Sequence, residues 1–238
     1  MRTLIIIPAY NEEKNLGNLI GALRELKENI NILVVNDCSK DKTYEVCKSL
    51  NVTCINLPCN LGIGGAVQTG YKYALKHNYD IAIQIDGDGQ HDPSYIKDVV
   101  RPIVEEGADL VIGSRFITNE GFQSTFTRRL GIKYFSLILS RLSGKKITDP
   151  TSGFRACGRR TIEYFAKVYP RDYPEPESIM HLSRLGHSIK EVPVIMKERG
   201  QGQSSITSMK SVYYMVKVSL AILIDYTNVI WLKGREGA

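Results

Sequence analysis

Several features that mark common protein classes are missing from this sequence. Its five cysteines are odd in number and form no C-x-x-C pair, so we expect reduced thiols in a cytoplasmic protein rather than a disulfide framework. No run reaches the ~18 uncharged apolar residues of a membrane-spanning helix. The nearest candidate, residues 211–232, contains Lys217 and Asp225. The apolar residues 4–9 run straight into Asn11 without a cleavage region, so we expect no targeting segment and a chain that does not cross a membrane by itself.

Two nucleotide-binding fingerprints are also absent. The glycines at 62, 64 and 65 do not continue in G-x-G-x-x-G register, and Tyr71 stands where a P-loop requires lysine. These absences argue against a dinucleotide dehydrogenase and a P-loop kinase. The net charge of +6 permits an anionic partner. Without a zinc finger or an aromatic-interleaved basic surface, we expect no nucleic acid, and favour an anionic lipid or a phosphorylated substrate.

Strand-like and helix-like stretches alternate along the first half of the chain. The 238 residues, 43% hydrophobic and 24% charged, have the composition of one globular domain. Strands are predicted at residues 3–8, 30–35, 52–57, 81–85 and 109–112, and helices at 12–28, 41–50, 64–77 and 93–106. This alternation predicts an α/β fold with an open, mostly parallel, Rossmann-like sheet covered on both faces. Such sheets bind ligands beyond the carboxyl ends of their strands.

Polar residues follow each of the five predicted strands. They are Glu12, Asp37, Asn60, Asp86, Asp88 and Arg115. Taken singly, each has an ordinary explanation, because Asp37 suits a helix cap and Asn60 suits a simple turn. Since the carboxyl ends of parallel strands lie along one edge of a sheet, we expect these residues to form a single site.

The strongest single signal is the segment Asp86-Gly87-Asp88-Gly89, which directly follows an apolar strand. Glycines remove side chains that would crowd a ligand. Hard divalent cations such as Mg²⁺ prefer oxygen ligands and usually keep substrate phosphates in their remaining positions. The segment therefore suits a metal that bridges the protein to a diphosphate, although an ordinary acidic turn has the same composition.

Six patterns follow one another in order between about residues 3 and 206. They are Ile-Pro-Ala-Tyr-Asn-Glu at 7–12, Val-Asn-Asp-Cys-Ser-Lys-Asp-Lys-Thr at 35–43, Asn-Leu-Gly-Ile-Gly-Gly-Ala at 60–66, Asp-Gly-Asp at 86–88, Gly-Ser-Arg-Phe at 113–116 and Asp-Pro-Thr-Ser-Gly-Phe-Arg at 149–155. Together they resemble the family 2 glycosyltransferases of GT-A fold, in particular the branch of polyprenyl-phosphate sugar synthases. An ordered set of this length is far more specific than any one motif.

The resemblance implies a nucleoside diphosphate sugar as donor and Mg²⁺ or Mn²⁺ as cofactor. It assigns the metal to Asp86, Asp88 and Gln90, and the nucleotide to Pro8, Tyr10, Glu12, Asp37, Asn60, Gly62, Asp86 and Arg199. Asp37 would recognise the nucleoside. Arg199 lies in a Gly- and Ser-rich stretch that is either a lid over the diphosphate or a surface loop. Position 36 is Asn where many relatives have Asp, which leaves the nucleotide open, and the missing Q-x-x-R-W motif argues against processive synthesis.

The acceptor decides which other residues take part in catalysis. A phosphomonoester is already an anion at pH 7, because its second pKa is near ~6, whereas an alcohol needs a general base. Arg115 and Arg129 resemble the acceptor-phosphate arginines of the polyprenyl branch. Glu175 and Glu177 lie where relatives with hydroxyl acceptors place a base, but acidic residues after prolines also suit an ordinary helix start. These four residues join Asp86 and Asp88 as catalytic candidates.

The C-terminal segment has its own pattern. Apolar residues recur at amphipathic-helix spacing at Val212, Met215, Val216, Leu220 and Leu223. We therefore predict a glycosyltransferase domain at residues 1–206 and a C-terminal amphipathic helix at 207–238. Such a helix packs on its own core, on a membrane surface or, by analogy alone, on a small membrane subunit.

The resulting hypothesis is a metal-dependent, inverting glycosyltransferase, peripherally associated with the inner face of the cell membrane. It moves one sugar from a nucleoside diphosphate sugar to a polyprenyl phosphate. One alternative enzyme glycosylates a hydroxyl of a lipid-linked or cell-wall saccharide, with Glu175 or Glu177 as base. A sugar-nucleotide-binding module without turnover is a third reading.

Overall fold

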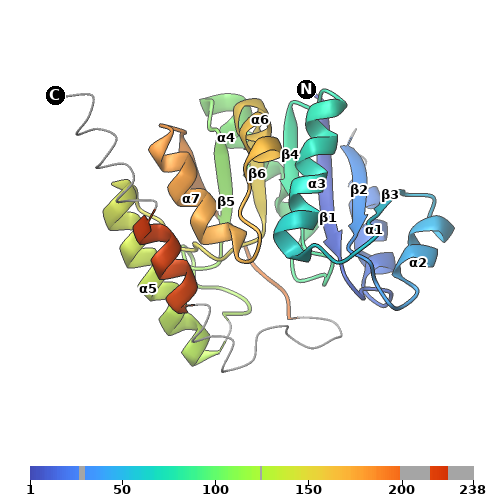
Figure 1. The fold of residues 1–238 in the computed structure, drawn as a ribbon, viewed down its shortest axis with the longest axis horizontal. Helices are drawn as coiled ribbons and strands as arrows, with labels where there is room; N and C mark the ends of the chain where they lie inside the picture. Colours follow the sequence, from blue (N-terminus) through green and yellow to red (C-terminus); the bar gives the residue numbers. More distant parts are fainter. Residues whose placement is uncertain (27–29, 124, 199–214, 225–238) are drawn as a thin grey trace.

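A computed structural model describes residues 1–26, 30–123, 125–198 and 215–224. Its centre is a seven-stranded sheet in the order β3-β2-β1-β4-β6-β5-β7 (Figure 1). The strands are β1 (Thr3–Ala9), β2 (Ile30–Asn36), β3 (Thr53–Asn56), β4 (Ile81–Gln84), β5 (Leu110–Ser114), β6 (Arg155–Gly158) and β7 (Ile189–Pro193). All paired strands are parallel except β6, which runs antiparallel between β4 and β5. This arrangement confirms the predicted fold class.

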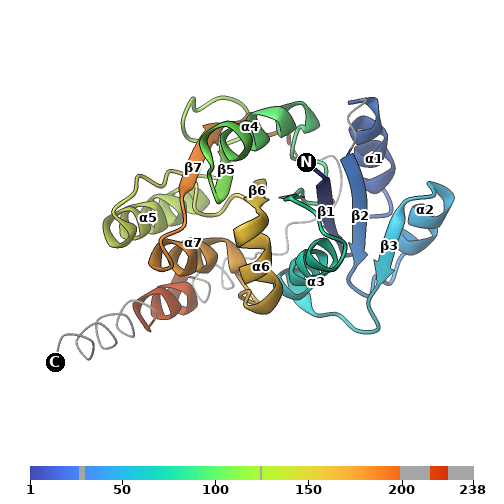
Figure 2. The same ribbon diagram turned by 90° about the horizontal axis from the view of Figure 1, so that it is seen from above.

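Helices cover both faces of the sheet (Figure 2). They are α1 (Leu16–Glu25), α2 (Thr43–Ser49), α3 (Gly62–Lys76), the 3₁₀ turn η1 (Pro93–Tyr95), α4 (Ile96–Glu106), α5 (Phe126–Ser143), α6 (Arg159–Lys167) and α7 (Pro174–Arg184). One face packs against α1, α2 and α4, and the other against α3, α5, α6, α7 and the helical residues 215–224. The fold therefore has three layers with a hydrophobic core on each side of the sheet.

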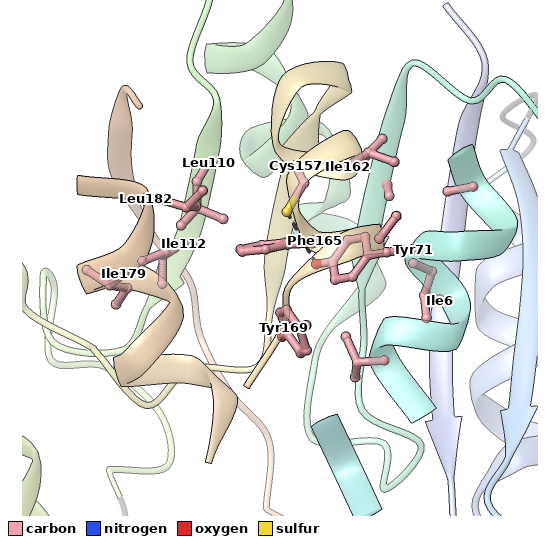
Figure 3. Close-up of a cluster of buried hydrophobic side chains, with 14 of the residues drawn as sticks. Ile6, Tyr71, Leu110, Ile112, Cys157, Ile162, Phe165, Tyr169, Ile179 and Leu182 are labelled. Carbon is pink, nitrogen blue, oxygen red and sulfur yellow. Dashed lines mark hydrogen bonds between the residues drawn. The ribbon is translucent and has the colours of Figure 1, made fainter. Parts of the chain in front are cut away.

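Alternation along the strands explains the two cores. Ile5 and Ile7 of β1 belong to one core, whereas Ile6 belongs to the other, because successive side chains of a strand point to opposite faces. Gly70 lets α3 approach the sheet closely, since a Cβ there would lie 2.3 Å from Cγ2 of Ile6. Beside this contact, Tyr71 packs within the aromatic core (Figure 3). Both faces of the sheet are buried, so its strands read as continuous apolar runs.

The beginning of α1 differs from the prediction. A helix was expected from Glu12, but α1 begins at Leu16. The preceding backbone is bonded elsewhere, because N–H of Glu12 donates to Oγ1 of Thr43 at 2.9 Å and N–H of Glu13 donates to Asp41 at 3.1 Å. These bonds hold residues 12 and 13 in the loop that follows β1.

The C-terminal helix departs from the predicted amphipathic pattern. Residues 215–224 are helical, while the rest of the predicted helix and the predicted boundary at 206 lie outside the described residues. The predicted apolar side chains Val216, Leu220 and Leu223 are each more than half exposed. The helix instead buries Val218 and Ile222. It is apolar on both sides, so the expected amphipathic pattern is not confirmed. Within the described part of the chain, no helix is both long and apolar enough to span a membrane.

Candidate active site

The loops after β1 and β2 are joined by hydrogen bonds at the carboxyl edge of the sheet. N–H of Asn11 donates to Oγ of Ser39 at 2.9 Å, and Oδ1 of Asn11 accepts from N–H of Lys40 at 2.8 Å. Together with the bonds of residues 12 and 13 to the second loop, these contacts bring Pro8, Tyr10 and Glu12 to the same edge as Asp37. Bonds of this kind fix the loop conformation before any ligand arrives.

Asp37 is buried and holds the next loop. Its two carboxylate oxygens accept from N–H of Leu61 at 2.7 Å and from N–H of Gly62 at 2.9 Å. The side-chain amide of Asn60 donates to the carbonyl of Asp37 at 3.2 Å. Gly62 has φ +77, a conformation that glycine adopts without strain. The structure therefore brings Asp37, Asn60 and Gly62 together, and Asp37 has a structural contact in addition to its predicted contact with a nucleoside.

Asn36, the residue before Asp37, is satisfied internally. It is 2% exposed, and its amide nitrogen donates to Oδ1 of Asn56 at 2.6 Å. Its Oδ1 accepts from the hydroxyl of Ser39 at 2.5 Å. An ionised aspartate here would lack the donor that Asn56 accepts from. The amide at position 36 therefore matches its partner in β3.

The metal turn, residues 86–92, follows β4. Oδ1 of Asp88 accepts from N–H of Gln90 at 3.1 Å. The side-chain nitrogen of Gln90 donates to the carbonyl of Lys197 at 3.4 Å, which leaves its amide oxygen as the group that suits a cation. Gly153 gives room to Asp86, because a Cβ at this position would lie 2.6 Å from Oδ2 of Asp86.

The donor set of the metal turn fits a hard divalent cation. Asp86, Asp88 and Gln90 supply two carboxylates and one amide oxygen, which are the ligand types that Mg²⁺ and Mn²⁺ take. Across the described ranges, no group of three or more His, Cys, Asp or Glu side chains is arranged to enclose a metal ion. A cation held here would therefore need further oxygen ligands, such as the phosphates of a donor.

His91 positions the turn and was missed from the sequence. It is 3% exposed, and its Nδ1 accepts from the backbone N–H of Asp86 at 3.1 Å. Its Nε2 lies 3.8 Å from Oδ2 of Asp86, and its ring stacks on Phe154 with centroids 5.2 Å apart. A histidine after the acidic turn was the available signal, but the sequence does not show that its ring folds back onto Asp86.

A buried polar cluster lies behind Asp86. The side-chain nitrogen of Gln84 lies 3.5 Å from Oδ1 of Asp86, and the hydroxyl of Tyr169 donates to Gln84 at 3.4 Å. Arg155 is 1% exposed and donates to the backbone carbonyl of Glu175 at 3.0 Å. Burial raises the pKa of Glu175 to about 7, with Arg155 lowering it and Asp86 raising it. The negative charge of Asp86 therefore disfavours ionisation of Glu175.

The second glutamate candidate shares a helix turn with the first. Glu177 is partly buried, and both residues lie in the first turn of α7. Acidic residues are favourable at that place, because a helix N-terminus carries partial positive charge. The position of Glu177 therefore fits both a residue that stabilises the helix N-terminus and a catalytic base.

Arg115 is held inside the protein. Its Nε and Nη2 donate to the carboxylate of Asp149 at 2.6 and 2.8 Å, and both residues are buried. Asp149 is placed in turn by Glu191, whose carboxylate accepts from N–H of Asp149 at 2.9 Å and of Thr148 at 2.8 Å. Burial raises the pKa of Glu191, and these N–H donors lower it. The charge of Arg115 is thus offset by Asp149.

A cavity of about 470 Å³ opens beside α5. It is lined by Phe116, Asn119, Gln123, Phe126, Arg129, Leu130, Ile132, Lys133, Ser136 and Thr148. Two cations, Arg129 and Lys133, lie on the same side of α5 because they are four residues apart. Arg115 precedes Phe116 but is not part of the lining. Asn119 and Gln123 contribute to one wall, and we call residues 119–123 the acceptor loop after the proposal made below. Arg199 lies outside the described residues.

Two neighbouring helices expose apolar side chains, and one of them, α5, also lines this cavity. On α5, Phe126, Leu130 and Leu137 are 73%, 63% and 69% exposed. The helix at 215–224 lies beside α5 (Figure 1) and is joined to it by a contact of 3.2 Å between the hydroxyls of Tyr134 and Ser219. Its exposed apolar side chains are Val216, Leu220, Leu223 and Ile224. We call these seven side chains the apolar face.

Comparison with known proteins finds relatives whose names describe sugar transferases that act on polyprenyl or dolichyl phosphates. The chain matches the family described as Glycosyl transferase family 2 over residues 4–165. It is 31% identical to the UDP-N-acetylglucosamine–dolichyl-phosphate N-acetylglucosaminyltransferase of Methanococcus voltae, over 93% of this chain and 97% of that protein. It is also 31% identical to the polyprenol monophosphomannose synthase of Mycolicibacterium smegmatis, over 92% of this chain and 86% of that protein.

The fold is similar to that of solved structures. Glucosyl-3-phosphoglycerate synthase from Mycobacterium tuberculosis, in complex with Mn²⁺, uridine diphosphate and phosphoglyceric acid, superposes with a TM-score of 0.71. The superposition covers 94% of this chain and 78% of that one at 19% sequence identity. At this identity the likeness supports the fold alone.

Proposed function

The chain belongs to glycosyltransferase family 2, and from this premise we propose that it moves one sugar from a nucleoside diphosphate sugar to a polyprenyl phosphate. The observation that carries the proposal is the cavity lined by the cations Arg129 and Lys133, whose lining also includes Phe116, two residues after the end of β5. The named relatives from Methanococcus voltae and Mycolicibacterium smegmatis support the acceptor class.

The donor side of the proposal rests on the rim after β1 to β4. Pro8, Tyr10, Glu12, Asp37, Asn60 and Gly62 would bind the nucleoside, and Arg199 would contact the diphosphate. Asp86, Asp88 and Gln90 would hold Mg²⁺ or Mn²⁺. A divalent cation there would neutralise the negative charge that develops on the leaving diphosphate.

The reaction would be a single in-line displacement with inversion. An oxygen of the acceptor phosphate attacks C1 of the sugar, a new C–O bond forms, and the bond from C1 to the β-phosphate breaks. The nucleoside diphosphate leaves with the bonding electron pair. Because the acceptor is already an anion at pH 7, no residue has to remove a proton. Arg129 and Lys133 would offset the repulsion between the two phosphate groups. Arg115 stays a predicted ligand of the acceptor phosphate, and its side chain is held in place by the ion pair with Asp149.

The apolar face is the surface through which the protein would contact the membrane that contains its lipid acceptor. Contiguous exposed apolar side chains on a protein surface mark interaction sites. Two of these side chains, Phe126 and Leu130, line the cavity that also carries two cations, as expected for a protein that takes a lipid phosphate from an anionic membrane surface. We propose peripheral attachment at the inner face of the cell membrane through α5 and residues 215–224, with a small membrane subunit as a further partner by analogy alone.

A hydroxyl acceptor is the second candidate, and one observation favours it. The pKa of Glu175, raised to about 7 by burial, suits a general base at neutral pH. In this reading Glu175 or Glu177 would remove the proton from a sugar hydroxyl of a lipid-linked saccharide.

Acceptor chemistry separates the proposals. The purified protein would be incubated with UDP-glucose, UDP-N-acetylglucosamine or GDP-mannose, with Mn²⁺ or EDTA, and with either farnesyl phosphate or farnesol. We expect an acid-labile glycolipid from farnesyl phosphate with at least one donor, only when Mn²⁺ is present. Product from farnesol but not from farnesyl phosphate would contradict the phosphate proposal, and nucleotide binding without any product would favour a binding module.

A further inference from the structure

The segment that follows β7 pairs with the metal turn. We call residues 195–197 the strap. Met196 forms an antiparallel β-bridge with His91. N–H of Lys197 donates to the carbonyl of Gln90 at 2.9 Å, and the ammonium of Lys197 lies 2.9 Å from Asp92. Backbone hydrogen bonds therefore fix the strap to the turn that carries the metal-binding candidates.

The other edge of the strap pairs with the acceptor loop. Met196 also forms a parallel β-bridge with Gly121, and its carbonyl accepts from N–H of Phe122 at 3.0 Å. Gly121 has φ +72, and a Cβ there would lie 2.5 Å from Cγ2 of Ile195 and 2.9 Å from the carbonyl of Met196. Only glycine fits this position without displacing the strap.

The acceptor loop in turn shapes the cavity. Asn119 and Gln123, on either side of the paired residues, line its wall. The side-chain nitrogen of Gln123 donates to the carbonyl of Arg115 at 3.1 Å. A shift of the strap would therefore move both the cavity wall and the support of Gln90, because one backbone segment is hydrogen-bonded to each.

We propose that the strap couples the two substrate sites, so that a nucleotide and metal bound at the metal turn raise the affinity of the cavity for a phosphate acceptor. This inference rests on the proposed function and adds a coupling between its two substrate sites. Coupling is reciprocal, so the acceptor would raise nucleotide affinity by the same factor. Couplings of this kind are typically about 5- to 150-fold.

Substitutions at each edge of the strap test the proposal. The Cβ of Gly121→Ala would collide with the strap. Gly186→Ala is its control, because it places alanine at a similar positive φ of +69, where a Cβ meets nothing within 4 Å. Lys197→Pro removes the N–H that bonds to Gln90, whereas Lys197→Ala removes only the ion pair with Asp92. Calorimetry would measure the dissociation constants of UDP and GDP with Mn²⁺, with and without farnesyl phosphate. Circular dichroism would confirm that each variant is folded.

The expected result is a coupling of about fivefold or more in the wild type, in Gly186→Ala and in Lys197→Ala. It should fall to about one in Gly121→Ala and Lys197→Pro, while each ligand still binds alone. A wild-type factor near one, with both ligands bound, would overturn the coupling and leave the proposed function standing. Full coupling in both folded edge variants, or its loss in Gly186→Ala, would also overturn it. A wild type that binds no nucleotide with Mn²⁺ would contradict the proposed function itself.

Discussion

The donor side of the rim, at the ends of β1 to β3, consists of short loops hydrogen-bonded to one another, whereas the acceptor side is a cavity beside a long helix with exposed apolar side chains. On the donor side, Asp37 alone fixes two backbone N–H groups of the next loop. On the acceptor side, Arg129 and Lys133 lie at the surface of α5. The difference teaches that the proposed donor site is preorganised by its own polar contacts, whereas the wall of the proposed acceptor site is held by backbone contacts with residues 195–197.

The largest expected effect is on the donor side. Asp88→Asn should lower transfer by about 10²–10³-fold, because it weakens the charge that holds a cation at the leaving diphosphate. The measurement is transfer to farnesyl phosphate at saturating donor, with Mn²⁺ binding followed by electron paramagnetic resonance. Asp92→Asn is the matched control, since Asp92 lies in the same turn but contacts Ser94 and Lys197. Undiminished transfer by a folded Asp88→Asn protein would remove the metal turn from the mechanism.

The next effect should appear only on the acceptor side. Arg129→Ala removes a cation from the cavity and should raise the acceptor KM by about 10- to 100-fold, with little change in the nucleotide dissociation constant measured without acceptor. Arg141→Ala, on the same helix but outside the cavity lining, is the control. If nucleotide binding without acceptor weakened by a similar factor, the division of the rim into two sides would be wrong.

A smaller loss should come from the nucleoside contact. Asp37→Ala should weaken UDP or GDP and the matching intact donor about equally, by about tenfold, because one charge-assisted hydrogen bond is lost. It should also lower the melting temperature, since N–H groups of Leu61 and Gly62 lose their acceptor. Loss of turnover with unchanged nucleotide affinity would argue against this role.

The smallest effect concerns stability against pH. Burial raises the pKa of Glu175 from 4.5 to about 7. Between these values the folded state binds more protons than the unfolded state, so stability falls as pH rises from about 4.5 to about 7. Glu175→Gln should make the loss of melting temperature between pH 5 and pH 8 smaller by a few degrees. Glu105→Gln, at an exposed site on α4, is the control and should keep the wild-type dependence of melting temperature on pH. The same dependence in Glu175→Gln would contradict the raised pKa of Glu175.

The donor side was largely predictable because its residues follow strands within a few positions. An apolar run followed by Asp86 and Asp88, or by Asp37, is a local pattern, and the sheet topology places these ends along one edge. The five predicted strands and the fold class are confirmed. The roles of the site residues in catalysis stay predictions.

The acceptor side was less predictable because its contacts join distant segments. Thr148 and Asn119 reach the cavity from separate loops, and β6 enters the sheet antiparallel from a later part of the chain. On the donor side as well, the contacts of His91 with Asp86 and of Tyr169 with Gln84 form only in the folded chain. For residues 215–224, spacing could not select the buried face, because apolar residues lie on both sides.

The central claim, that the nucleophile is a phosphate and needs no protein base, is tested most directly by the two glutamates of α7. Glu175→Gln and Glu177→Gln would be assayed for sugar transfer to farnesyl phosphate at pH 7.5, with fold and nucleotide affinity measured in parallel. Both variants should keep transfer within about tenfold of the wild type, because the acceptor is already ionised. A loss of about 10²–10⁴-fold in either variant, with fold and nucleotide affinity preserved, would show that a general base is required and would contradict the phosphate-acceptor account.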